Sequence, residues 1–164
     1  ESPPRGHGEA STSITQEQIL MIYGLKIVKQ ENGKFRVTCR DIPECDFEED
    51  TLEAAAKSAG HVLPGAMVLC YRQKKKAIPL PTKLQKDESP CRVPLKVQAK
   101  LLLWNFMVNN GLRIADVARK LGISHTEASR LVDLTHDSAS IDTVEAAAEK
   151  LGAHFTLTAE TLPA

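Results

Sequence analysis

The chain has 164 residues, which is enough for one ordinary domain or for two small ones. Its 42% apolar and 26% charged residues are typical of a globular protein and exclude a disordered or collagen-like chain. The formal net charge is zero, which excludes a protein that coats nucleic acid or anionic lipid without specificity. Sequence-specific DNA binding stays open, because it can depend on a few well-placed contacts.

The cysteine pattern and the apolar runs indicate the compartment. Four cysteines lie far apart without a C-x-x-C pair, and no secretory signal begins the chain, so we expect free thiols and a cytoplasmic protein. The longest apolar run, 101–104, is too short to cross a membrane.

Residues 1–20 are rich in Pro, Gly, Ser and Thr and too poor in apolar residues to pack. We interpret them as a mobile tail, or as an extension before a natural start at Met21. The alternative is a tail that docks as a helix through Ile14, Ile19 and Leu20.

From Met21 the apolar residues alternate, and Asn32-Gly33 interrupts the alternation. Asn-Gly between two alternating runs predicts a β-hairpin, here over 22–41, because both residues tolerate positive φ. A short third strand is expected at 45–49.

A helix is predicted to begin near Thr51, with Asp50 and Glu53 forming a capping box. Gly60 and Pro64 predict a kink or a break before Val68, since an interior proline removes a hydrogen bond.

The residues that follow this helix are polar or rich in proline. The lysines at 74–76 predict a solvated turn, with a phosphate contact as the alternative. The polar stretch 82–90 is interpreted as a linker between two modules.

After residue 94 the apolar period becomes helical. The first helix, 95–110, ends at Gly111 and has a second apolar face at Leu101, Trp104 and Val108. Another domain or another subunit should cover that face. Further helices are expected at 113–121, 124–134 and 142–151, the last capped by Asp142 and ended by Gly152, with a terminal strand at 154–160.

The segment from Ile114 to Val132 predicts a helix-turn-helix. Ala118 is small where the helices cross, Gly122 permits the turn, and Ser124 caps the second helix. Val117, Leu121, Ile123 and Leu131 form the wedge between the helices. The predicted DNA-contacting residues are Arg113, Arg119, Lys120, Ser124, His125, Thr126, Ser129 and Arg130. The alternative is a plain αα-hairpin with polar residues on its surface, and Ala128 weakens the match, since a larger aliphatic residue usually fills that position.

Five acids between Glu44 and Asp50 have three interpretations: a solvated edge strand, an acidic face for a basic protein, and a Mg²⁺ site for nuclease chemistry. Residues 22–29 contain no acid that could complete a metal site. No nucleophile–base arrangement appears, and the histidines lack metal-ligand spacing, so we predict no enzyme, no metal and no cofactor.

Five short motifs in this order resemble the HicB antitoxin family: Asp41-Ile-Pro-Glu, Asp50-Thr-Leu-Glu-Ala-Ala, Ile78-Pro-Leu-Pro, Val93-Pro-Leu-Lys and the helix-turn-helix. The resemblance covers Met21 to about residue 158. It implies a non-catalytic, partial ribonuclease-H-like β-β-β-α-β module that blocks a HicA toxin, an mRNA-cleaving protein. It also implies a dimeric DNA-binding domain that represses the operon. Gly60 and Pro64-Gly65 depart from the family's uninterrupted helix.

The expected fold class is therefore α+β, with a tail at 1–20, a toxin-binding module at 21–89 and a helix-turn-helix module at 90–164. We expect an antitoxin and autorepressor that binds a HicA-like toxin, operator DNA and a second copy of itself. The expected toxin-facing residues are Glu44, Asp46, Phe47, Glu48 and Glu49. The expected dimer contacts are Leu101, Trp104, Val108, Phe155 and Leu157. The alternative function is a stand-alone repressor whose N-terminal module senses a different protein or ligand.

Overall fold

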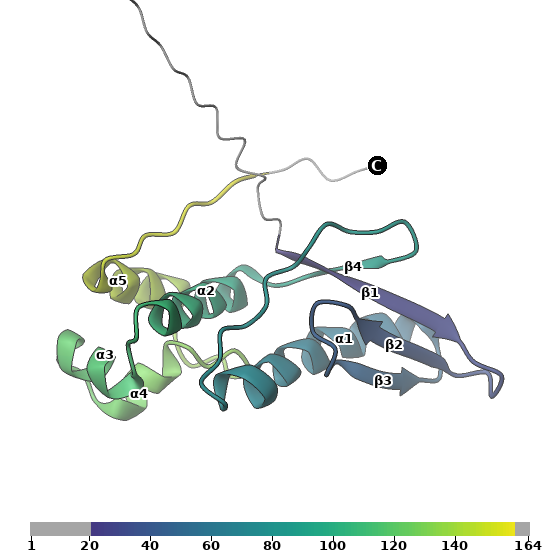
Figure 1. The fold of residues 1–164 in the computed structure, drawn as a ribbon, viewed down its shortest axis with the longest axis horizontal. Coiled ribbons are helices and arrows are strands. Elements are labelled where there is room, and N and C mark those ends of the chain that lie inside the picture. Colours follow the sequence, from purple (N-terminus) through teal and green to yellow (C-terminus); the bar gives the residue numbers. More distant parts are fainter. Residues whose placement is uncertain (1–20, 160–164) are drawn as a thin grey trace, which may run out of the picture.

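The computed structural model describes residues 21–159, so the predicted tail at 1–20 and residues 160–164 lie outside the described part. Figure 1 shows a sheet with one long helix at one end of the molecule and shorter helices at the other. The elements are β1 (Ile22–Lys29), β2 (Phe35–Cys39), β3 (Asp46–Glu49), α1 (Leu52–Met67), the π-helical segment η1 (Val68–Arg72), β4 (Ser89–Arg92), α2 (Leu95–Asn109), α3 (Ile114–Leu121), α4 (His125–Arg130) and α5 (Ile141–Leu151). An antiparallel sheet with separate helices confirms the α+β class.

The four strands form one antiparallel sheet in the order β3-β2-β1-β4. β1 and β2 are the predicted hairpin, with Leu25 opposite Cys39, and Gly33 has a φ of 81° in the turn. The predicted third strand is also present, and it pairs with β2 through Phe47 opposite Val37. Strands β3 and β4 are therefore the edges of the sheet.

One face of the sheet packs on α1 (Figure 1), and part of the other face is covered by the segment before β4, whose Glu88 lies against Gly24 and pairs with Arg40 at 3.0 Å. Every second residue of a strand points to the same face of the sheet, and helix residues four apart lie on the same face of the helix. The core between the sheet and α1 therefore buries Tyr23, Leu25, Val37, Cys39, Ala55, Ala59, Leu63 and Met67. The alanines have small side chains, so the helix can approach the strands closely. The face away from α1 carries polar residues such as Lys26 and Arg36, both exposed.

Helix α1 bears on two predictions, and it corrects the first of them. Its N-cap is Thr51, whose hydroxyl accepts a hydrogen bond from the Ala54 amide at 3.1 Å, and not Asp50. The α-helix continues through Gly60 and Pro64 to Met67, and it changes to the π-helical segment η1 at Val68, the residue before which a kink or a break was predicted. A continuous stripe of buried residues against the sheet outweighs the hydrogen bond that the proline removes.

The linker predicted over 82–90 is wrong at its end, because Ser89 and Pro90 begin β4 and pair with Leu25 and Gly24 of β1. A proline is tolerated there because β4 is an edge strand. Proline lacks a backbone N–H, and on an edge strand this group is not needed for a hydrogen bond to a neighbouring strand. The predicted module boundary between residues 89 and 90 thus falls inside a strand of the sheet.

The C-terminal helices follow the predicted order with three corrections. α4 ends at Arg130 and not at residue 134. α5 is capped by Ser140, whose hydroxyl accepts from the Thr143 amide at 3.2 Å, and not by Asp142. Residues 154–159 form no strand. Alternation alone does not make a strand, since its backbone groups need a partner.

The second apolar face of α2 is covered by the same chain. Leu101 and Trp104 are buried, and the Trp104 indole N–H donates to the Lys76 carbonyl oxygen at 2.8 Å. The Arg72 guanidinium lies 5.9 Å from the centre of the Trp104 ring. The sequence left open whether another domain or another subunit covers this face. At Leu101 and Trp104 the cover comes from the same chain, so these two residues are not available for contact with a second subunit.

Candidate functional site

Helices α3 and α4 form a tight pair whose turn follows the expected chemistry. Gly122 ends α3 with a φ of 65°, and Ser124 caps α4. The Ser124 hydroxyl accepts from the Glu127 amide at 3.1 Å, while the Glu127 carboxylate accepts from the Ser124 amide at 3.2 Å. Ala128, which is smaller than the residue expected at its position, is buried. The pair therefore holds the start of α4 in a fixed orientation.

Three of the four α4 side chains predicted to point outwards do so. His125, Thr126 and Arg130 are exposed. Ser129 is half-buried, and both its hydroxyl and its carbonyl oxygen accept from one Arg72 nitrogen, at 2.8 Å and 3.2 Å. Ser129 was also predicted on the outward face, and there its hydroxyl is bonded to the Arg72 guanidinium of η1. Sequence reasoning missed Arg72, since a lone arginine at a helix end carries no pattern.

The cations of α3 are organised by one acid. Asp116 accepts from the Arg113 side chain at 3.3 Å and from the Arg119 side chain at 2.7 Å. The hydrogen bond from the Arg113 amide, followed by the one from its side chain, lowers the pKa of Asp116 to about 2. Lys120 is exposed beside them. This network fixes two guanidinium groups on one surface and leaves that surface net positive.

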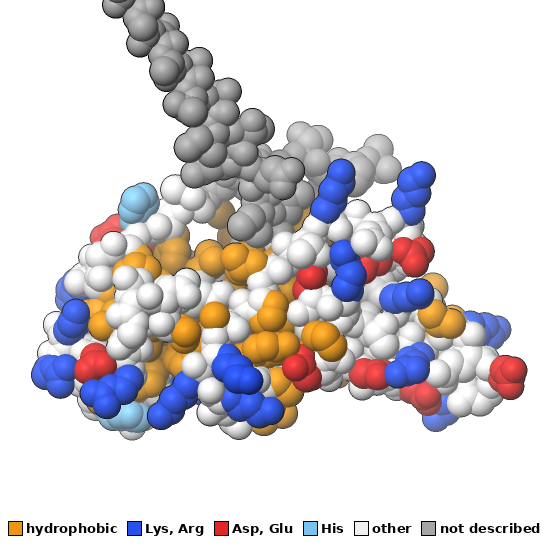
Figure 2. Space-filling model, viewed as in Figure 1, with side chains coloured by type: hydrophobic (Ala, Val, Ile, Leu, Met, Phe, Trp, Pro, Cys, Tyr) orange, Lys and Arg blue, Asp and Glu red, His pale blue; other side chains and the backbone are white. Residues whose placement is uncertain are grey.

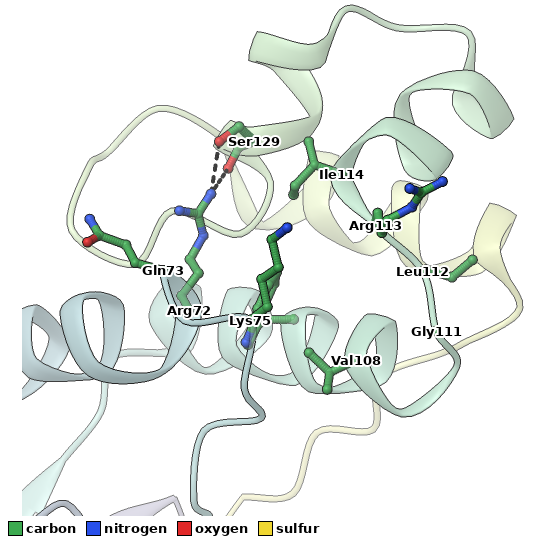
Figure 3. A pocket seen from close by; sticks show the side chains of 10 residues that line it. Arg72, Gln73, Lys75, Val108, Gly111, Leu112, Arg113, Ile114 and Ser129 are labelled. Atoms are coloured by element: carbon green, nitrogen blue, oxygen red, sulfur yellow. Dashed lines mark hydrogen bonds between the residues drawn. The ribbon is translucent and has the colours of Figure 1, made fainter.

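A cavity of about 360 Å³ lies where the end of η1 meets the helix pair (Figure 3). The cations Arg72, Lys75 and Arg113 line it together with apolar residues that include Trp104 and Ile114. In Figure 3 the Lys75 side chain points from its turn towards Ile114. Arg72 Nε is buried and has no hydrogen-bond partner among the described residues.

The predicted acidic surface lies on the edge strand β3 and the turn before it. Asp46 is held by two hydrogen bonds from Arg36, at 3.0 Å and 2.6 Å, and the hydrogen bond lowers the pKa of Asp46. Glu49 accepts from the Ser58 hydroxyl at 2.7 Å, on the side of α1. Glu48 is exposed and forms no ion pair with a described residue, and Phe47 is half-buried.

Glu44 has a partner that the sequence did not reveal. The Tyr71 hydroxyl donates to it at 2.7 Å. Burial, and then this hydrogen bond, raise the pKa of Tyr71 to about 12, so the phenol remains a donor at neutral pH. Of the five acids in this stretch, Glu44, Asp46 and Glu49 are held by hydrogen bonds and Asp50 lies 3.8 Å from the Lys34 ammonium. Glu48 forms no ion pair with a described residue.

The remaining predicted dimer residues differ in exposure. Val108 and Phe155 are half-buried, and Leu157 is 78% exposed. Leu157 lies in the irregular segment that follows α5.

The four cysteines are free, as predicted, and burial raises the pKa of the Cys45 thiol to about 12. In the described range no three His, Cys, Asp or Glu side chains are grouped so as to hold a metal ion. Between residues 21 and 159 no helix combines the length and apolar character that a membrane span requires.

Comparison with known proteins places the chain in a family. Residues 22–102 match a family model described as a HicB-like antitoxin of bacterial toxin–antitoxin systems. The chain is 33% identical over 143 residues to Antitoxin HicB of Pseudomonas fluorescens (strain Pf0-1), covering 87% of this chain and 96% of the relative. It is 31% identical over 137 residues to Antitoxin HicB of Escherichia coli (strain K12), covering 84% and 98%. The chain therefore belongs to the HicB family of antitoxins.

Proposed function

We propose that this chain is a cytoplasmic antitoxin and autorepressor with two modules. The N-terminal module, from residue 21 to the end of β4, binds and blocks a small HicA-type mRNA-cleaving toxin, and the helices from α2 onwards bind operator DNA as a dimer. Membership of the antitoxin family supports the first activity. The second is carried by one observation, the capped α3–α4 pair that presents His125, Thr126 and Arg130 to solvent.

The N-terminal module acts as a binding platform and not as an enzyme. Its β-β-β-α-β order is the order expected of a partial ribonuclease-H-like module. β1 contains no acidic residue, so the acids of β3 lack the partner that two-metal hydrolysis requires.

The acidic edge is the proposed toxin-binding surface, formed by Glu44, Asp46, Phe47, Glu48 and Glu49. A protein that cleaves RNA needs cations for its phosphate backbone, and an acidic edge is complementary to such a surface. The test is co-expression of the toxin with Glu48→Lys antitoxin, which should rescue growth less well than wild type. Glu149→Lys, a charge reversal on exposed α5, is the matched control. Equal rescue by both variants would remove this surface from the proposal.

The helix pair is the proposed operator-binding surface. The residues assigned to it are Arg113, Arg119, Lys120, Ser124, His125, Thr126 and Arg130, with Ser129 held by Arg72. In a dimer, two such helices would enter successive major grooves roughly 34 Å apart. An arginine that reads guanine with two hydrogen bonds contributes about 1–3 kcal/mol, so Arg130→Ala should weaken binding of the promoter at least several-fold.

Gel shift with the promoter fragment of the chain's own operon measures this loss. Lys150→Ala removes one exposed cation from α5 and is the control. Unchanged binding by Arg130→Ala would mean that α4 is not the recognition helix. Sedimentation of wild type and Leu157→Asp tests the dimer, for which Val108, Phe155 and Leu157 are the contacts left on the surface.

A stand-alone repressor is the second candidate, and one observation favours it. The cavity between η1 and the helix pair combines cations with an apolar wall, as a ligand-sensing site does. The two candidates separate on one genetic test, which is whether an adjacent reading frame is toxic alone and harmless when co-expressed with this chain. A repressor without a toxin would bind the promoter and lack such a neighbour.

A further inference from the structure

The turn that follows η1 carries three consecutive lysines with exposed side chains, Lys74, Lys75 and Lys76. None of them forms an ion pair with a residue in the described part of the chain. Three adjacent ammonium groups without a carboxylate repel one another, and an external anion would relieve this repulsion.

The turn is held rigidly in place. The Lys75 amide donates to the Arg72 carbonyl oxygen at 3.0 Å, and the Lys76 amide donates to the Tyr71 carbonyl oxygen at 2.8 Å. The Trp104 indole fixes the Lys76 carbonyl from α2. These bonds form a helix-ending turn anchored to a second helix, so the fold sets the backbone positions from which the three lysine side chains extend.

Lys75 occupies a backbone conformation that favours glycine. Its φ is 58°, and it is the only residue other than glycine with positive φ among residues 21–159. A lysine at this position costs conformational energy that glycine would avoid. The chain therefore has a cation at position 75, where the backbone conformation favours glycine.

The same turn lies against the proposed operator-binding surface. Lys75 and Arg113 line one cavity with Ser129 of α4 (Figure 3). Arg72, directly before the turn, is bonded to Ser129. In Figure 2 the Lys and Arg side chains gather along the lower left edge of the molecule, over the turn and over α3 and α4. Cations from both modules thus converge on one surface.

We propose that the turn Gln73–Lys76 is a second, phosphate-binding part of the DNA interface, which extends the operator contact from α4 onto the N-terminal module. This inference rests on the proposed operator binding. In a helix-turn-helix complex the first helix crosses the DNA backbone while the second enters the groove. α3 is that first helix, and Lys75 lines the same cavity as Arg113 at the start of that helix. The lysines supply charge without base-specific geometry, so they position the protein and do not read sequence.

The test uses the full chain and measures affinity for its own promoter fragment by fluorescence anisotropy at several salt concentrations. Substituting Lys74, Lys75 and Lys76 together by Gln should weaken binding about tenfold or more. The slope of log affinity against log salt should fall by roughly 0.9 for each phosphate that the lysines no longer neutralise. A scrambled DNA fragment should bind more weakly by a similar factor. Substituting Lys29, Lys83 and Lys86 by Gln removes the same charge from exposed positions elsewhere in the module and should change little.

Lys75→Gly distinguishes the removal of charge from a defect in folding. It should weaken DNA binding while the thermal midpoint stays equal or rises, because glycine suits the positive φ. A wild-type affinity and salt slope in the triple variant would overturn the inference and leave operator binding by α4 intact. Failure of the wild-type chain to bind the promoter would overturn operator binding itself, and this inference with it. Weaker binding of a matched single-stranded RNA but not of the promoter would also overturn it.

Discussion

The side-chain amide of Asn105 pairs with both backbone groups of Ile78. Its oxygen accepts from the Ile78 amide at 2.7 Å, and its nitrogen donates to the Ile78 carbonyl oxygen at 2.9 Å. Both residues are buried, so neither backbone group of Ile78 has water as an alternative. One polar side chain in the middle of an apolar helix therefore binds the segment between η1 and β4 to α2.

Replacing Asn105 by Ala should destabilise the protein by about 3 kcal/mol. The substitution leaves a buried N–H and a buried C=O without partners, and each costs roughly 1–3 kcal/mol. Urea unfolding measures the change. Asn109→Ala, at an exposed position of the same helix, is the control and should change the midpoint little. Equal midpoints for the two variants would contradict this role of the amide.

Lys100→Met should cost about 2 kcal/mol although it replaces a charged side chain by an apolar one of similar length. The Lys100 residue is 1% exposed, and its ammonium donates to the carbonyl oxygens of Asp133 at 2.9 Å and His136 at 2.8 Å. Methionine cannot donate to either. Lys96→Met, one turn earlier on a more accessible lysine that pairs with Asp137, should cost much less in the same unfolding experiment.

Lys75→Gly should stabilise the protein by about 1 kcal/mol, because a residue with a Cβ pays roughly this amount to adopt the left-handed conformation. Lys74→Gly is the matched control. Lys74 has no positive φ, so glycine there should be neutral or destabilising. Thermal unfolding of the two variants gives the comparison, and destabilisation by both would show that the turn is not strained at Lys75.

The Asp116 carboxyl should titrate with a pKa of about 2, below the ordinary value of 3.8. Because the folded-state pKa is lowered, its contribution to stability is fully present above pH 3.8 and is lost as the pH falls towards 2. The stability difference between wild type and Asp116→Asn should therefore shrink over that window. The carboxyl carbon shift in NMR reports the midpoint directly, and a midpoint at or above 3.8 would show that Arg113 and Arg119 do not hold this acid.

Local sequence chemistry was sufficient for much of the fold. Alternating apolar residues around Asn32-Gly33 predicted the hairpin, and Gly122 with Ser124 predicted the turn between α3 and α4. In each case the signal and the structure lie within a few residues of each other. Where the outcome depended on distant partners, local signals were not sufficient. α1 continues through Pro64 because the sheet holds it, and residues 154–159 form no strand because alternation does not supply a neighbour.

In the candidate site, too, the features set by local sequence were predicted and the contacts between distant residues were not. Exposure of His125, Thr126 and Arg130 followed from helix geometry alone. The contact between Arg72 and Ser129 joins residues 57 positions apart, and no local pattern predicts such a pair. The one available signal was the second apolar face of α2. It required a cover, and the cover proved to be the segment that brings Arg72 and the lysine turn to the helix pair.

The intramolecular cover of α2 also affects how the chain can be divided. Cutting between residues 89 and 90 would separate β4 from β1 and uncover Trp104, which contacts Lys76 and Arg72, on the C-terminal fragment. The fragment would then expose apolar surface that is buried in the whole chain, and such surfaces drive self-association. Oligomers of an isolated C-terminal fragment could therefore result from the apolar surface that the cut exposes. The native assembly should be measured on the whole chain.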